Sequence, residues 1–420
     1  MITYNRRTFL SLAMATLGLA WADRLFAWPI LKNPCLDAAA VPNDSPWLQH
    51  IWDGLNLEDV WDSHCHVAGL GDSQGAAASG IVLGRGMRQP LSHPWQYFRR
   101  DFIMNASCAT MPAYRAEGLS VDEGYVRRLT ELMAAMPTGF KTLLLAFDYP
   151  HDEAGRPLPE KCSFYVPDDY AMRVTAANPD RFVWAASIHP YRPDALDRLR
   201  QAKADGAKAV KWIPQAQNIV PDSPKCDAFY RELARLRLPL LCHTGEEKAL
   251  FGVGEQDFAN PLRLRRALDA GVTVIAAHCA ITGQHLDHDH GDKRIDGYRL
   301  FARVMEESLG ASAGSGLFYG DISAVTLVIK KTEYLRELLT RDDWAHRLIN
   351  GSDYPLPGII PLISLTKLAS DGLLPKEAIA DLDLVRSHNP ILFDFAVKRA
   401  LSWQGKKFAA KIFESRRVFT

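Results

Sequence analysis

The sequence predicts an α/β protein, namely a (β/α)8 TIM barrel with a long insertion after its first strand and an N-terminal arm. Two observations predict this fold. Eight short apolar runs of strand type alternate with helical patterns, which indicates a parallel sheet, and eight such units close into a barrel. Several of these runs stop at a histidine, a lysine or an aspartate, and the catalytic residues of a barrel lie at the carboxyl ends of its strands.

The eight expected strands are short apolar runs bounded by turn residues, and the barrel that they form is expected over residues 58–401. They cover residues 59–64, 141–147, 181–188, 207–213, 238–243, 272–278, 317–322 and 346–352. With 420 residues and 47% hydrophobic composition, the chain can bury the core of one such domain. Residues 402–420 are expected to form a C-terminal tail.

The N-terminal segment has the pattern of an export signal. Arg6 and Arg7 precede a mildly apolar stretch from Phe9 to Trp21, and residues 20–22 offer a small-x-small cleavage site. This pattern predicts a twin-arginine signal peptide over residues 1–22 and a periplasmic location. A short membrane anchor is the alternative, but the stretch is shorter than the ~20 residues that span a bilayer. The mature chain is therefore expected to carry no stable membrane span, and residues 23–57 are expected to form the arm.

The connection from Val67 to Phe140 is much longer than a strand-to-helix connection needs. An insertion after the first strand emerges on the catalytic face of a barrel, so residues 67–140 are a candidate lid or substrate wall. Arg88 and Trp95 are its candidate contacts to an anionic or aromatic substrate, together with Arg85, Arg99 and Arg100. Ordinary surface and packing roles are the alternative for all five.

Five residues at the ends of the expected strands have the chemistry of a metal site. His64 and His66 have the same parity in one strand, so both side chains reach the same face. His243, His278 and Asp353 each lie at or just beyond the end of another apolar run. Neutral imidazole and carboxylate are common zinc ligands, and such a set leaves one position open for water. The sequence therefore predicts a divalent metal cofactor, with zinc as the expected ion.

These motifs together resemble the amidohydrolase superfamily, in particular its amidohydrolase-related branch. They are Asp62-x-His64-Cys-His66, Ala-Val-Lys211-Trp-Ile-Pro, His243-Thr-Gly, His278-Cys-Ala, Gly-Ser-Asp353-Tyr-Pro and Asn389-Pro. The resemblance implies that His64, His66 and Asp353 bind a first metal ion. It implies that His243 and His278 bind that ion or a second one. It also implies that Lys211 is carboxylated and bridges two ions, so the count is one ion, or two if the carbamate forms.

The resemblance also implies a reaction, with Asp353, His278 and Lys211 as the catalytic residues. Metal-activated water would cleave an amide, a cyclic amide or a lactone, with Asp353 taking up its proton and His278 or His189 polarising the carbonyl. Asp321 is expected to point to the same face and to contact polar groups of the substrate. Non-oxidative decarboxylation is the alternative reaction. Deamination is another, because His243-Thr-Gly-Glu246 resembles a deaminase motif. A non-enzymatic metal-binding protein is the third.

The charge balance narrows the range of expected binding partners. The formal net charge is zero and no basic stripe is present, so we expect a small-molecule substrate and no nucleic acid. A homo-oligomer remains open.

Cys65, Cys242 and Cys279 are expected to be small buried residues that face away from the metal. Four cysteines lie outside the expected strands, and the sequence does not say which of them pair: Cys35, Cys108, Cys162 and Cys226.

Overall fold

Eight parallel strands form the central sheet, and neighbouring strands follow one another along the chain. The computed structural model describes residues 33–41, 45–89, 91, 93–250, 252–310 and 317–420. The strands of this sheet are β1 Trp61–His66, β3 Lys141–Leu145, β5 Phe182–Ala186, β6 Ala209–Trp212, β7 Leu240–His243, β8 Val274–Ala277, β11 Phe318–Asp321 and β12 Leu348–Ile349. Each overlaps a strand predicted from the sequence, so the predicted α/β barrel is confirmed.

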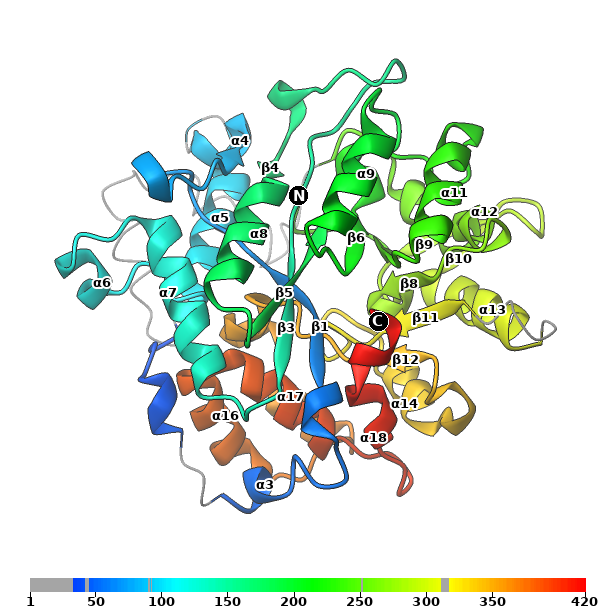
Figure 1. The fold of residues 1–420 in the computed structure, drawn as a ribbon. Helices are drawn as coiled ribbons and strands as arrows, with labels where there is room; N and C mark the ends of the chain where they lie inside the picture. Colours follow the sequence, from blue (N-terminus) through cyan, green and yellow to red (C-terminus); the bar gives the residue numbers. More distant parts are fainter. Residues whose placement is uncertain (1–32, 42–44, 90, 92, 251, 311–316) are drawn as a thin grey trace, which may run out of the picture.

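Backbone hydrogen bonds join the segment after the last strand to the first strand. The amide of Ser63 donates to the carbonyl of Asn350 at 3.0 Å, and the amide of Asp353 donates to the carbonyl of His64 at 2.7 Å. The amide of His66 donates to the carbonyl of Tyr354 at 2.9 Å. These bonds close the sheet into a barrel, which occupies the centre of Figure 1 with helices around it.

The helices that surround the barrel mostly follow a strand. They are α7 Val121–Ala134, α8 Asp168–Ala177, α9 Ala195–Ala204, α11 Asp227–Leu236, α12 Arg265–Asp269, α13 Gly297–Gly310, α14 Thr332–Thr340, α16 Ala378–His388 and α17 Pro390–Ala400. Short helices α10 Pro214–Gln217, α15 Leu365–Ser370 and α18 Ala410–Phe413 lie in connections or near the C-terminus. Among the residues that the structure describes, no helix has the length and apolar character that crossing a bilayer requires.

Alternate residues of each strand face opposite sides, as the period of a strand requires. Leu241 packs in the barrel interior, whereas its neighbour Cys242 packs in the layer between strands and helices. Leu143 and Leu144 divide in the same way. This alternation sends one residue in two along every strand into the barrel, where the strand ends can present polar groups.

The C-terminal tail covers the end of the barrel at which β1 starts. Val418 and Phe419 belong to the interior cluster, and the Phe419 ring stacks on that of Trp61 with centroids 5.9 Å apart. Because Trp61 is the first residue of β1, the tail covers the amino end of that strand. The carboxyl ends of the strands are left to form a cavity.

The insertion forms part of a wall above the carboxyl ends of the strands. It contains β2 Val82–Leu83, α4 Arg85–Arg88, α5 Pro94–Ala106 and α6 Pro112–Ala116. Strand β2 pairs antiparallel with β4 Phe164–Tyr165, which lies in the connection after β3. The insertion is therefore tied to a second loop of the same face.

A disulfide links the N-terminal arm to the insertion. Cys35 and Cys108 are bonded to each other, across 73 residues of sequence, and Cys108 lies just after α5. The arm is also held by Arg128, whose guanidinium donates to the carbonyl oxygens of Leu36 and His388 at 2.7 and 2.8 Å. The expected signal peptide, residues 1–22, and the first ten residues of the expected arm lie outside the described residues.

Candidate metal centre

The end of β1 places two imidazoles in one cavity. His64 and His66 both line this cavity, whereas Cys65 between them is buried in the outer layer of the core. The side chain of His64 is fully buried and that of His66 is 27% exposed. The parity argument from the sequence therefore describes the observed directions of these side chains.

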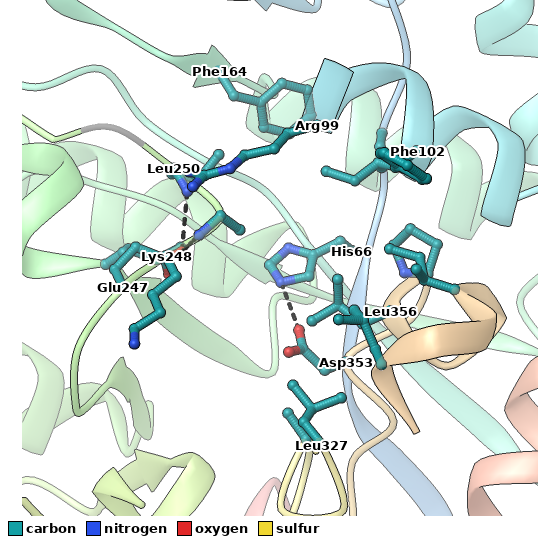
Figure 2. A pocket seen from close by; sticks show the side chains of 18 of the residues that line it. His66, Arg99, Phe102, Phe164, Glu247, Lys248, Leu250, Leu327, Asp353 and Leu356 are labelled. Atoms are coloured by element: carbon teal, nitrogen blue, oxygen red, sulfur yellow. Dashed lines mark hydrogen bonds and ion pairs between the residues drawn. The ribbon is translucent and has the colours of Figure 1, made fainter. Parts of the chain in front are cut away.

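Asp353 brings a carboxylate to the same point from the segment after β12. Its Oδ1 lies 3.1 Å from Nε2 of His66 and 3.5 Å from Nε2 of His64. Its backbone has a φ of 58°, a left-handed conformation that aspartate tolerates better than most residues. Burial alone would raise the pKa of Asp353, but the neighbouring His64, His66 and Lys211 lower it below its ordinary value. Asp353 is therefore held as a carboxylate that faces two imidazoles, and Figure 2 shows its contact with His66.

The glycine in Gly351-Ser352-Asp353 is required by close packing against β1. A Cβ at Gly351 would lie 2.6 Å from Cβ of His64 and 2.9 Å from Oδ1 of Asp321. Asp62 accepts hydrogen bonds from the amide and the hydroxyl of Ser352 at 2.8 and 2.6 Å. Asp62 and Gly351 thus hold the segment that carries Asp353 directly against the strand that carries His64.

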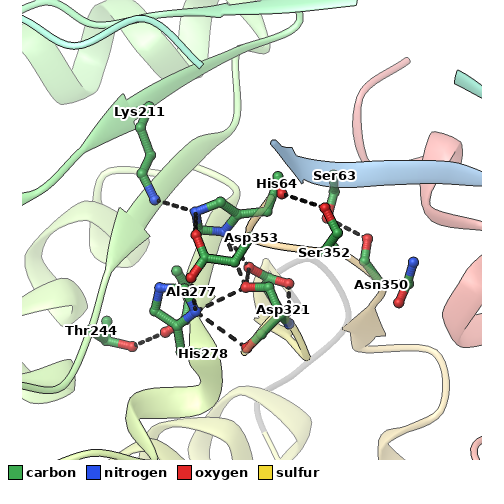
Figure 3. Close-up of polar contacts among 12 residues, drawn as sticks. Ser63, His64, Lys211, Thr244, Ala277, His278, Asp321, Asn350, Ser352 and Asp353 are labelled. Carbon is green, nitrogen blue, oxygen red and sulfur yellow. Dashed lines mark hydrogen bonds and ion pairs between the residues drawn. The ribbon is translucent and has the colours of Figure 1, made fainter. Parts of the chain in front are cut away.

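A hydrogen bond to Asp321, at the end of β11, orients the ring of His64. Nδ1 of His64 donates to Oδ2 of Asp321 at 2.6 Å, and the hydroxyl of Ser323 donates to the same oxygen at 2.5 Å. A carboxylate only accepts hydrogen bonds, so Nδ1 of His64 carries the hydrogen and Nε2 keeps its lone pair toward the cavity. Figure 3 shows these contacts. Asp321 is itself fully buried and outside the cavity lining, so it contacts His64 and does not reach the cavity, where the sequence led us to expect a contact with substrate.

Two further imidazoles approach from β7 and from the residue after β8. The ring centroids of His243 and His278 are 5.0 Å apart, and those of His278 and His64 are 4.9 Å apart. The hydroxyl of Thr244 donates to the carbonyl of Ala277 at 2.6 Å and so ties the two strand ends together. Nδ1 of His278 lies 2.9 Å from the hydroxyl oxygen of Ser323. Four histidines therefore converge from the ends of three strands, β1, β7 and β8.

Lys211 points into this group from β6. Its Nζ donates to Nε2 of His64 at 3.1 Å, and the residue is almost fully buried. Burial lowers the pKa of Lys211, and the carboxylates of Asp353 and Asp321 only partly oppose this effect. The amine thus lies among the expected ligands, where the sequence placed it.

The residues present fit a divalent metal ion. His64, His66 and Asp353 each offer a ligand atom within 4.8 Å of the others. Nε2 of His243 is buried and has no hydrogen-bond partner among the described residues, which is the state of a ring nitrogen kept for a ligand. Ligand atoms of His64, His278 and Asp321 also lie within 4.8 Å of one another. We favour the first group, because the contact between His64 and Asp321 is already a hydrogen bond and Asp321 does not reach the cavity.

A cavity of about 420 Å³ lies over these candidate ligands. Its floor is formed by His64, His66, Lys211, His243, His278 and Asp353. Its walls are mostly apolar and include Leu83, Met87, Phe102, Ile103, Phe164, Ile213, Leu250, Leu327, Leu356 and Ile359. A volume of this order suits a small organic molecule. Part of the wall comes from α5 and β2, so the insertion contributes to the cavity.

Four expected substrate contacts lie elsewhere or at the margin. Trp95 is 68% exposed, Arg88 is exposed, and neither lines the cavity. The residues of α5 that line it are Arg99, Arg100, Phe102, Ile103 and Met104. His189 is buried away from the cavity, and its Nε2 lies 2.9 Å from the carbonyl oxygen of Gln217. Both ring nitrogens of His189 contact backbone groups, so its role is structural. Glu246 lines the cavity, but its side chain is 40% exposed and pairs with Lys248 at 3.2 Å.

Three charged residues near the site were not singled out from the sequence. Glu247 is the buried carboxylate of its loop, with Oε2 3.6 Å from Nε2 of His243. Lys330 lines the cavity after β11. Lys398 of α17 is fully buried and donates to the carbonyl of Gly351 at 2.6 Å and to Asp394 at 2.6 Å. Glu247 and Lys330 lie in irregular loops, where no periodicity predicts a direction. Lys398 could have been noticed as a lysine four residues after Asp394 on a mostly apolar helix.

Comparison with known proteins gives matches among solved structures alone. No family model and no curated protein matches the chain. An uncharacterised TIM-barrel protein from Bordetella bronchiseptica has a TM-score of 0.46 and 16% identity over 78% of this chain and 99% of its own. A candidate 2-pyrone-4,6-dicarboxylic acid hydrolase from Pseudomonas putida has a TM-score of 0.39 and 14% identity, over 80% and 97%. A dihydroxybenzoic acid decarboxylase from Polaromonas, with bound manganese and 2-nitroresorcinol, has a TM-score of 0.39 and 14% identity, over 80% and 96%.

Proposed function

We propose that this protein is a metal-dependent hydrolase of the amidohydrolase type, which cleaves an amide, cyclic amide or lactone bond of a small organic substrate. The observation that carries the proposal is the approach of His64, His66 and Asp353 to one point on the floor of a cavity of about 420 Å³. Histidine and carboxylate ligands that leave an open position are typical of catalytic zinc sites. Zinc is therefore the ion that we propose.

Each residue of the proposed centre has its own role in the reaction. His64, His66 and Asp353 would hold a divalent ion, which would supply a water of lowered pKa and polarise a carbonyl group. Asp353, which is ionised at neutral pH, takes up the proton at its carboxylate and returns it to the leaving group. Asp321 keeps His64 in the tautomer that turns Nε2 to the cavity. The walls around the floor are mostly apolar and favour an apolar substrate body.

Lys211 is proposed to carry a carbamate. A buried ammonium beside a dication is repelled, whereas a carbamate at the same nitrogen is an anion and a ligand. Lys211 lies 3.1 Å from one expected ligand nitrogen and is almost fully buried, which supports this proposal. The same modification would permit a second ion near His243 and His278.

Decarboxylation is the second candidate function. The observation that favours it is the apolar wall, which includes Phe102, Phe164 and Leu356 and suits the ring of an aromatic acid better than a polar peptide-like substrate. Deamination with Glu246 as proton donor has less support, since Glu246 is paired with Lys248 at the surface.

Metal content and activity of the His66→Ala variant test the proposal. We expect this variant to lose bound metal and turnover, because it removes one of the three proposed metal ligands. His50→Ala is the matched control, since His50 is exposed and its imidazole pairs with Asp53. Purified variants are compared by elemental analysis and on a panel of lactones, amides and aromatic acids. Metal content of His66→Ala equal to that of the parent would rule out this centre. Release of carbon dioxide without hydrolysis would select the second candidate.

We also propose that the protein is exported to the periplasm by the twin-arginine route. The disulfide between Cys35 and Cys108 supports an oxidising compartment, because disulfides are rare in reducing cytosol. Replacing Arg6 and Arg7 with lysine should retain the protein in the cytoplasm, since the export machinery recognises the arginine pair. Cell fractionation gives the answer, and a variant that still reaches the periplasm would refute the route.

A further inference from the structure

A further lysine lines the cavity, apart from the metal centre and from Lys248. Lys330 lies in the loop between β11 and α14, and its Nζ donates a hydrogen bond to the hydroxyl of Thr282. Among the described residues this hydroxyl is the one hydrogen-bond partner of Nζ, and Lys330 makes no ion pair with a carboxylate there. The cavity therefore contains a cation whose charge is not balanced by a direct neighbour.

Two other cations of the cavity have carboxylate partners, and Lys211 contacts His64. Lys248 pairs with Glu246 at 3.2 Å, and Arg100 pairs with Asp101 at 2.6 Å. Oε1 of Glu247 accepts hydrogen bonds from two backbone amides of its own loop. A carboxylate supplied by a ligand would give Lys330 the partner that the protein does not.

The position of Lys330 keeps it charged at neutral pH. Burial lowers the pKa of Lys330 to about 8, and the more distant carboxylates of Asp353 and Glu247 oppose the effect of burial. Most of the population is thus protonated at pH 7. A poorly solvated ammonium that hydrogen-bonds to a neutral hydroxyl gains much from an anionic partner, because charge-assisted hydrogen bonds are stronger than neutral ones.

The wall beside Lys330 is apolar. Leu327 and Ile329 precede it in the same loop and line the cavity, and Ile329 is 52% exposed. Leu356 and Phe102 line the same cavity, and Figure 2 shows them with Leu327 around His66 and Asp353. A molecule that fills this space presents an apolar body to the wall and one polar end to Lys330.

We propose that Lys330 binds a carboxylate of the substrate, and that the substrates are small carboxylic acids with an apolar or aromatic body. The carboxylate contacts Nζ of Lys330, the body lies against Leu327 and Ile329, and the reacting bond faces Asp353. Lys330 then selects anionic substrates and sets their position. The statement about the reacting bond rests on the proposed function, whereas the binding of the carboxylate does not.

Calorimetric titration of the metal-loaded protein with benzoate and with its neutral counterpart benzamide tests the proposal at pH 7. The parent is expected to bind benzoate more tightly than benzamide. Lys330→Met keeps most of the volume and removes the charge, and it should weaken benzoate binding by about 10-fold or more with little effect on benzamide. Lys330→Arg should restore most of the affinity. Lys330→Gln is the second variant if the methionine variant does not fold.

Lys331→Met is the matched control. Lys331 is the next residue, is 54% exposed at its side chain, pairs with Asp296 and does not line the cavity, so benzoate binding should not change. Equal affinity of the parent for benzoate and benzamide, unchanged benzoate binding in Lys330→Met, or equal loss of both probes would each overturn the proposal. Metal content separates this test from that of the proposed function. A selective loss in Lys330→Met with unchanged metal in His66→Ala would keep the carboxylate site and reject the hydrolase centre.

Discussion

Oδ2 of Asp321 lies 2.6 Å from Nδ1 of His64, and this hydrogen bond decides which nitrogen of His64 faces the cavity. Replacing Asp321 with asparagine keeps the size of the side chain and removes the charge that favours the Nδ1–H tautomer. We expect Asp321→Asn to bind metal about 10 to 100-fold more weakly, as is typical when a residue that orients a metal ligand is lost. Competition with a chelator measures this affinity. An affinity equal to that of the parent would show that the bond does not orient His64.

Asp353→Asn should separate metal binding from turnover. The amide oxygen still reaches the site, but the side chain no longer accepts a proton, so turnover should fall about 100 to 10,000-fold while much of the metal is kept. Elemental analysis and steady-state kinetics on any accepted substrate give the two values. Asp343→Asn is the control, since Asp343 pairs with Arg341 at the surface. A metal-loaded variant with near-normal turnover would remove Asp353 from proton transfer.

Lys211→Ala should lower the metal content from about two ions per chain to one or none, because the proposed carbamate bridges the ions. Short carboxylic acids should partly restore the content by occupying the vacated bridge. Lys208→Ala, in the segment just before β6, is the control because Lys208 lies outside the cavity. Mass spectrometry under native conditions and elemental analysis report the carbamate and the ions. An unmodified Lys211 beside one fully occupied ion would reject the two-ion site.

The pH dependence of substrate binding should follow Lys330. The pKa of Lys330 is lowered to about 8, so its ammonium is present below pH 8 and is lost as the pH rises above it. The KM for a carboxylate substrate should therefore rise above pH 8, although Glu247, Asp353 and Lys248 also act on Lys330 electrostatically. In Lys330→Arg this rise should disappear, because a guanidinium stays protonated. A profile that is the same in parent and Lys330→Arg would contradict the assignment.

The disulfide between Cys35 and Cys108 should stabilise the folded chain and the wall formed by α5. Removing both cysteines, as Cys35→Ser with Cys108→Ala, should lower the free energy of unfolding by about 2–4 kcal/mol, since the bond closes a long loop in the unfolded chain. Chemical denaturation measures the change. A reducing agent should destabilise the parent similarly and leave the double variant unaffected, and equal sensitivity of the two would argue against the bond.

Strand geometry made part of the site predictable. His64, His66, Lys211 and His243 lie within strands, where the direction of a side chain follows from its parity. The same rule placed Cys65 and Cys242 in the outer layer. The parallel order of the strands then brought their carboxyl ends to one face, so residues far apart in the chain could be assigned to one centre.

Residues in loops were not predictable in this way. Glu246 and Glu247 are neighbours, and the hydrogen bonds of Glu247 to the amides of Ala249 and Leu250 turn it inward while Glu246 pairs with Lys248. His189 lies beyond the end of β5, and its contact with the Gln217 backbone takes it away from the cavity. Such directions depend on contacts that the local sequence does not encode.

The sequence by itself thus determined the barrel, its strands and the set of expected ligands, because the period of a strand and the alternation of strands with helices are local properties. The tertiary structure decided that Asp321 supports His64, that Lys330 faces the cavity and that Cys35 pairs with Cys108. Each of these depends on which distant segments come into contact, and packing across the whole barrel determines those contacts.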